Sequence, residues 1–133
     1  PYPRRRRTDA VPQVPDVKAE VMNRLRVVLP CPVVSKRPEG ANTPPEFVRV
    51  IATGGAGRLH VATAHVQLTI DSYAPTTGRA MKLGLDVDGV MNTLPKTDAP
   101  VGAVTGTCPA EGVDDSTVAK RVTATYQITA RLV

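Results

Sequence analysis

Apolar residues recur along the first part of the chain at the spacing of a helix. In residues 16–29 they fall three or four positions apart, with two further apolar neighbours, at Val17, Val21, Leu25, Val28, Met22 and Leu29. Charged and amide side chains occupy the positions between them, so the segment predicts an amphipathic helix. Asp16 is placed to cap its first turn, and Pro30 and Pro32 are expected to end it.

Three later segments have the period of two that is typical of strands. Residues 47–53 are β-branched and apolar, residues 64–73 alternate between apolar and polar side chains, and residues 121–132 alternate most regularly of all. Successive side chains of a strand point to opposite faces, so these segments predict half-buried strands. Between the first two, Gly54, Gly55 and Gly57 predict a flexible turn that makes them hairpin partners. Residues 33–36 and 101–108 predict shorter strands.

Pro75, with Thr76 and Thr77, is predicted to open a second helix. Its buried stripe would contain Ala80, Leu83, Val87, Met91 and Leu94, and Pro95 would end it. Gly84 and Gly89 lie inside it, and each costs about 1 kcal/mol relative to alanine. The helix should therefore depend on packing against the sheet for its stability.

The order of helix, strands, helix, strands predicts an α+β fold, in which an antiparallel or mixed β-sheet carries two helices on one face. Residues 1–15 contain four prolines around an arginine run, a composition that resists both helix and strand. We therefore expect an extended N-terminal arm over residues 1–15 and a single domain over residues 16–133.

The charge of the protein is concentrated in that arm. The formal net charge is +5, and Arg4, Arg5, Arg6 and Arg7 supply four of these charges. Such a run can bind nucleic acid, bind an acidic neighbouring protein, or simply be solvated. Aromatic residues make up only 3% of the chain, which argues against stacking platforms for bases or sugars. No apolar run is long enough for a membrane span or a signal peptide, so a soluble protein is expected.

No candidate catalytic group, metal site or cofactor site is predicted. Cys31 and Cys108 stand 77 positions apart without nearby histidine, and are expected to be thiols. His60 and His65 would face opposite sides of a strand. The glycine segment that ends at Arg58 lacks the Gly-Lys-Ser/Thr ending of a phosphate loop. The carboxylate pairs are interpreted as a solvated helix face, at Asp86 and Asp88, and a turn, at Asp114 and Asp115.

In aggregate, residues 16–133 resemble the tail terminator (tail-completion, head-to-tail joining) proteins of long-tailed bacteriophages. The resemblance rests on the opening helix followed by Leu29-Pro30, residues 47–50 leading into Gly54-Gly55, the strand at residues 66–75, the helix from Thr77, and the alternating last strand. The arginine arm and the glycine-rich stretch at residues 95–117 depart from the family pattern. These are patterns of packing and turns, not a catalytic signature.

The resemblance implies a non-enzymatic virion protein of the neck, assembled in the host cytoplasm. It would form a ring, usually of six copies, that caps the tail tube of major tail tube protein, stops its polymerisation and joins it to the head stopper or connector protein. Genomic DNA would pass through the lumen without sequence specificity. The candidate interaction residues are Arg4, Arg5, Arg6, Arg7, Gly54, Gly55, Gly57, Arg58, Arg121 and Arg131.

Two other classes of protein remain open at this point. One is a different neck component, a stopper or head–tail adaptor, which is also small and ring-forming. The other is a small basic nucleic-acid-binding module, suggested by the sequence pI of about 9.6. Without the four arm arginines the body carries a charge of about +1, which argues against the second class. An enzyme ranks third.

Overall fold

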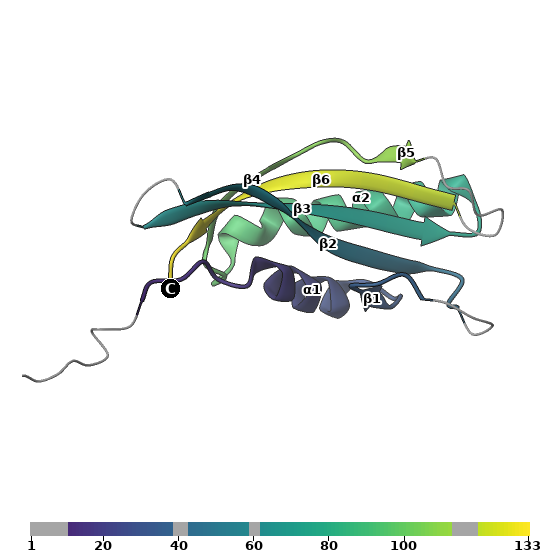
Figure 1. Ribbon diagram of the computed structural model, residues 1–133. Coiled ribbons are helices and arrows are strands. Elements are labelled where there is room, and N and C mark those ends of the chain that lie inside the picture. Colours follow the sequence, from purple (N-terminus) through teal and green to yellow (C-terminus); the bar gives the residue numbers. More distant parts are fainter. Residues whose placement is uncertain (1–10, 39–42, 59–61, 113–119) are drawn as a thin grey trace, which may run out of the picture.

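Long antiparallel strands form the frame of the protein (Figure 1). The computed structural model describes residues 11–38, 43–58, 62–112 and 120–133. In chain order, the elements of this part are α1 (Val17–Val28), β1 (Val33–Val34), β2 (Phe47–Arg58), β3 (Thr63–Ala74), α2 (Thr77–Thr93), the short 3-10 helix η2 (Leu94–Lys96), β4 (Val101–Gly106), β5 (Ala110–Gly112) and β6 (Lys120–Arg131).

The strands form one sheet in the order β1-β2-β3-β6-β4, with β5 also beside β6. β1 is parallel to β2, and every other pair is antiparallel. The four strands β2, β3, β6 and β4 therefore alternate in direction across the sheet. Both helices pack on the same face, as Figure 1 shows, so the predicted α+β class with a mixed sheet is confirmed.

The strand registers divide the sheet into two ends. At one end, which we call the closed end, β1 pairs with β2 at Val48 and Arg49, while β5 pairs with β6 at the same level. At the other, the open end, β4 lies level with the second half of β2. Two rows of partners fix that level: Ala52, Leu68, Tyr126 and Gly106; and Arg58, Ala64, Ala130 and Val101.

The first helix begins and ends where the sequence predicts. The Ala19 N–H donates to Asp16 Oδ1 at 3.0 Å, which satisfies an amide that the first turn leaves without an intrahelical partner. Leu29 leaves the helix with extended backbone and is 7% exposed. The prediction that Val28 is buried is wrong. Its side chain is 59% exposed, and Leu29 fills the core at this end in its place.

The second helix is held against the sheet by the predicted apolar stripe, because all five of its residues are less than 5% exposed. The Arg79 N–H donates to the capping Thr76 hydroxyl at 3.2 Å. Gly84 has a packing role, since a Cβ there would lie 2.9 Å from Val122 Cγ1. The missing side chain lets α2 approach β6 closely.

The aliphatic core lies between the helices and one face of the sheet, with Leu25, Leu68, Ile70, Met91 and Ile128 at its centre. The Tyr126 hydroxyl, on the same face, donates to Asp88 Oδ1 at 2.9 Å. The interpretation of Asp88 as a merely solvated side chain is therefore wrong, because it accepts a hydrogen bond from a buried tyrosine.

The predicted flexible turn at the glycines is also wrong, because β2 continues through them to Arg58 and pairs with β3. Gly54, Gly55 and Gly57 have φ of 104°, 108° and 78°, and the register shifts between Ala52 and Gly54 and again between Gly54 and Gly57. These are bulges within a strand. A Cβ on Gly55 would come within 2.7 Å of the His65 carbonyl oxygen, so only glycine fits there.

Candidate interaction surface

No helix of the described residues packs on the sheet face opposite α1 and α2, and this face consists largely of small, uncharged polar side chains. We call this surface the outer face and define it by ten residues: Thr53, Ala56, His65, Gln67, Thr69, Ala103, Thr105, Thr125, Gln127 and Thr129. All ten are half-buried or exposed. The alternation of β3 and β6 puts them there, because every second residue of each strand points into the core instead.

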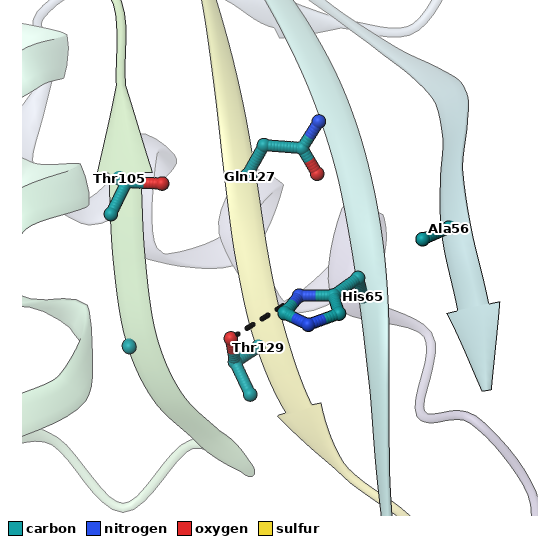
Figure 2. A pocket seen from close by; sticks show the side chains of 6 residues that line it. Ala56, His65, Thr105, Gln127 and Thr129 are labelled. Carbon is teal, nitrogen blue, oxygen red and sulfur yellow. Dashed lines mark hydrogen bonds between the residues drawn. The ribbon is translucent and has the colours of Figure 1, made fainter. Parts of the chain in front are cut away.

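Side chains of the outer face bond to one another across the strands. Gln127 Nε2 donates to Gln67 Oε1 at 2.7 Å, and the hydroxyls of Thr69 and Thr125 lie 3.3 Å apart. The Thr129 hydroxyl lies 3.4 Å from His65 Nδ1, as Figure 2 shows. Cross-strand hydrogen bonds of this kind stabilise a sheet and hold its side chains in place. The outer face is therefore an ordered polar surface rather than a set of freely moving side chains.

A shallow depression of about 410 Å³ lies at the open end of the outer face. In Figure 2, Ala56 on β2 and Thr105 on β4 flank His65 and Gln127 on the two central strands. Among the described residues that line it, His65 is the one titratable side chain, and the others are alanine, threonine and glutamine. A surface of this kind offers area and hydrogen bonds, so it suits contact with another macromolecule.

The closed end of the same face is covered and carries charge. Phe47 and Tyr73 stack with ring centroids 4.5 Å apart, and the Arg37 guanidinium lies 5.0 Å from the centre of the Tyr73 ring. Arg49 pairs with Asp71 at 2.5 Å, and the Asp71 side chain is only 3% exposed. These groups serve the stability of the fold.

The structure brings some of the predicted interaction residues together and separates others. Gly54, Gly55, Gly57 and Arg58 form the second half of β2, and Arg131 ends β6 at the same end of the sheet. Arg121 lies at the other end of β6, ten residues and therefore about 34 Å away. Arg4, Arg5, Arg6 and Arg7 lie outside the described residues.

Arg58 and Arg131 both bond to backbone carbonyl oxygens of their own chain. Arg58 donates to the carbonyl of Pro12, next to Gln13, which exchanges two backbone hydrogen bonds of 2.9 Å with Val133. Residues 11–15 of the predicted arm thus reach the open end of the sheet. Arg131 donates to the carbonyl of Ala99 at 3.0 Å. Both guanidinium groups hold chain segments at the open end.

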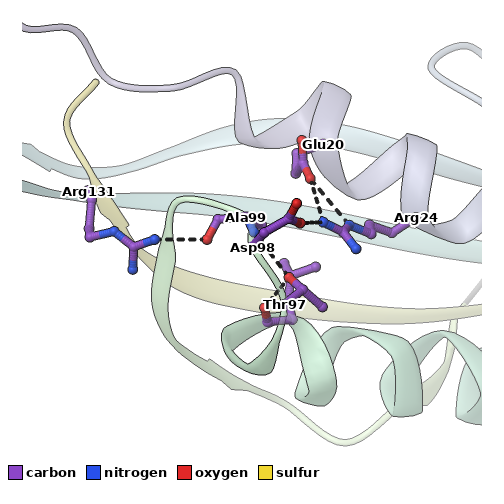
Figure 3. A network of polar contacts seen from close by, with 7 residues as sticks. Glu20, Arg24, Thr97, Asp98, Ala99 and Arg131 are labelled. Atoms are coloured by element: carbon purple, nitrogen blue, oxygen red, sulfur yellow. Dashed lines mark hydrogen bonds and ion pairs between the residues drawn. The ribbon is translucent and has the colours of Figure 1, made fainter.

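Figure 3 shows how the segment between α2 and β4 is fixed. Arg24 on α1 bonds to Glu20 and to Asp98, and the hydrogen bond from Arg24 holds the pKa of Asp98 below its usual value. The Thr97 hydroxyl donates to the Leu94 carbonyl at 2.6 Å and accepts from the Ala99 N–H at 3.3 Å. These contacts place Ala99 beside Arg131, and so position β4 at the edge of the sheet.

Cysteine, histidine and carboxylate side chains are the candidates for catalysis and metal binding. Burial raises the pKa of the Cys31 thiol, and the charge of Glu46 adds to this, so Cys31 is less nucleophilic than an ordinary cysteine. Cys108 is a free, exposed thiol. In the described part of the chain, no three His, Cys, Asp or Glu side chains gather where they could hold a metal ion. His60 lies outside that part.

Neither described α-helix has the combination of length and apolarity that crossing a membrane requires.

Comparison with known proteins gives one kind of match. No family model matches the chain, and no curated protein sequence matches it. Among solved structures, a chain from the virion of a native gene transfer agent particle is similar, with a TM-score of 0.65 at 10% sequence identity. The match covers 86% of this chain and 94% of the other. At this identity the likeness shows a shared fold over nearly the whole of both chains.

Proposed function

We propose that the protein is a structural component of a phage-like virion and acts there as a tail terminator. In this role, copies of the chain form a ring, expected to be a hexamer, on the finished end of the tail tube. The ring stops further addition of tube protein and presents a docking surface to the head connector. Genomic DNA passes through its centre.

The observation that carries the proposal is the fold shared with a virion chain over 94% of that chain's length. The match also spans 86% of this chain. The surface of the described residues agrees with such a role. It includes a polar sheet face and two open sheet edges, which are contact surfaces, and burial raises the pKa of the Cys31 thiol, which makes that thiol less reactive.

The outer face suits the channel side of such a ring. The side chains at its centre are threonine, glutamine and alanine. The arginines on this face lie toward the ends of the strands: Arg49, which pairs with Asp71, and Arg121 at the closed end, and Arg131 at the open end. DNA is bound tightly when lysine and arginine neutralise its phosphates. A surface whose centre lacks those cations lets DNA pass and holds it weakly, which is what a neck requires during packaging and release.

Purified tail tube protein and this protein provide the test. We expect the protein to form rings in negative-stain images, to bind one end of each tube, and to stop elongation when added to growing tubes. An unrelated small basic protein is the control for non-specific arrest. If the protein stays monomeric with and without tubes and leaves tube length unchanged, the terminator role is wrong.

A stopper or head–tail adaptor is the second candidate, because a shared fold with a virion chain supports any small ring-forming neck protein equally. Particles stalled during assembly separate the two. A terminator copurifies with headless tails, whereas a stopper copurifies with DNA-filled heads that lack tails. Recovery of this protein only on tailless heads would assign it to the head side of the neck.

A further inference from the structure

Two edges of the sheet lie open at the open end. Beyond Arg49, no described residue pairs with the outer edge of β2, and β4 has no described strand on its far side. Residues 52–56 of β2 are exposed, as are Gly102, Ala103, Thr105 and Gly106 of β4. Strand edges of this kind present backbone N–H and C=O groups that another strand can bind.

These edges lack most of the features that prevent strands from pairing between molecules. Monomeric proteins commonly place lysine, other charges or proline on an open edge. Residues 50–57 and 101–107 contain none of these, and their side chains are small or apolar. The exception is Arg58 at the end of β2, whose guanidinium donates to the Pro12 carbonyl. Bulges remain at three places: between Ala52 and Gly54 and between Gly54 and Gly57 in β2, and at Gly102 in β4. Through His65 and Thr129 the registers place the second β2 bulge and the β4 bulge at the same level, so the two edges bend at one matching position.

The directions of the strands make the two edges complementary. β2 and β4 are the outer members of four strands that alternate in direction, so they run opposite to each other. A second copy placed beside the first in the same orientation brings its β4 antiparallel to β2 of the first. The antiparallel alternation then continues across the boundary between copies. β1 occupies the edge of β2 at Val48 and Arg49, and so limits how far the neighbouring strand can slide.

We propose that residues 52–58 of β2 in one copy pair with β4 of the next copy, so that neighbouring subunits share one continuous antiparallel sheet. This inference rests on the proposed ring. The contact is heterologous, because each copy contributes a different edge on each side, and repetition of such a contact closes into a ring when the rotation permits. The occupant of each open edge is therefore a second copy of this chain.

Cysteine pairs provide the first test. Ala56 and Ala103 lie on the same face and at nearly the same level, but three strand spacings, about 14 Å, separate them within one molecule. That distance is too long for a disulfide inside one chain. In a Cys31→Ala, Cys108→Ser background, we expect Ala56→Cys with Ala103→Cys to give a ladder of covalent multimers on oxidation. Each single variant should give none.

The matched control pairs Ala103→Cys with Leu85→Cys, because Leu85 is 53% exposed on α2, on the helical side of the protein. This pair should stay uncross-linked. Covalent dimers from either single variant would show a two-fold contact at that edge and would overturn the proposed pairing of β2 with β4 of the next copy. Absence of multimers from the Ala56→Cys, Ala103→Cys pair within rings seen by electron microscopy would overturn it as well.

Lysine at the edge provides a second test that does not depend on disulfide geometry. Thr53→Lys and Thr105→Lys should each abolish multimers in analytical ultracentrifugation while the melting temperature stays within about 2 °C of wild type. Leu85→Lys should change neither property. If both edge variants still form rings, the proposed pairing of β2 with β4 is wrong, but the proposed ring is not. If the wild type forms no ring alone or on tail tubes, the proposed function itself is wrong.

Discussion

The closed and open ends of the sheet are built from the same three long strands but differ in what their outer face does. At the closed end, Phe47 and Tyr73 are each 1% exposed and stacked, and Asp71 is paired with Arg49. At the open end, Ala56, Thr105 and Gln127 surround a shallow depression. One end buries large side chains, and the other keeps small ones at the surface.

This difference indicates how a small domain can divide its roles along one sheet. At the closed end, the outer face buries two large aromatic rings, and this burial contributes to the free energy of unfolding. The open end makes less use of burial, and its glycines keep side chains away from the edge of β2. We therefore expect substitutions at the closed end to change the free energy of unfolding, and those at the open end to change assembly.

Truncation of the aromatic stack should have the largest effect. Phe47→Ala removes a ring that is 1% exposed and stacked at 4.5 Å on Tyr73. We expect a loss of about 3–5 kcal/mol in the free energy of unfolding, measured by urea denaturation. Thr53→Ala, an exposed position on the same strand, is the control and should lie within about 0.5 kcal/mol of wild type. A loss below 1 kcal/mol for Phe47→Ala would remove the distinction between the two ends.

Gly55→Ala should have the next largest effect, and it is the exception at the open end. The backbone there has φ of 108°, and a Cβ would meet the His65 carbonyl oxygen at 2.7 Å. We expect a loss of about 1–3 kcal/mol. Gly89→Ala, at an exposed position in α2 with open space around it, should instead stabilise the protein by about 0.5–1 kcal/mol. Equal effects in thermal denaturation would contradict the structure of the bulge.

On the core face, in the row of strand partners where the open end begins, Tyr126 gives a pH-dependent test. Burial raises its pKa above the ordinary value of about 10, and the hydrogen bond to Asp88 and the charge of that carboxylate raise it further. Since the pKa is higher in the folded protein, the stabilisation is complete below pH 10. It is lost as the pH rises beyond 10, because the unfolded chain ionises first.

Tyr126→Phe should therefore cost about 1 kcal/mol at pH 8. The difference from wild type should shrink in urea titrations carried out at steps from pH 9 to pH 11. A difference that stays constant over this range would show that the hydroxyl ionises as easily in the folded protein as in the unfolded one.

Gln127→Ala should have the smallest effect on stability. Gln127 is exposed at the open end, and its hydrogen bond to Gln67 exchanges readily for one to water. We expect the free energy of unfolding to change by less than about 0.5 kcal/mol. A loss comparable to that of Phe47→Ala would mean that the outer face stabilises the fold at both ends alike, and that the comparison between them is wrong.

The sequence predicts those parts of the fold in which local chemistry and packing agree. Asp16 caps α1 as expected, α2 begins at Thr77 as expected, and the strict alternation of residues 121–132 identifies β6 and its two faces. Glycine inside a segment, by contrast, is compatible with both a turn and a bulged strand, so its presence alone does not distinguish the two. The pairing of Gly54 and Gly57 with β3 depends on tertiary contacts that no local pattern contains.

The candidate surface is only partly predictable for the same reason. The polar positions of β3 and β6 identify Gln67, Thr69 and Thr125 as one face, but their hydrogen bonds depend on a register between distant segments. The separation of Arg121 from Arg131 follows from the length of β6, which the alternation already indicates. β5 escapes prediction because Ala110–Gly112 is too short to show a period.

The alternating directions of β2, β3, β6 and β4 also determine the polarity of any assembly that continues the sheet. Antiparallel pairing between copies requires all of them to point the same way. Every closed end, with Phe47 and β1, would then lie on one rim, and every open end, with Arg58 and Arg131, on the opposite rim. A ring made of one kind of subunit would thereby offer two chemically different faces, and two unlike partners could each recognise their own side.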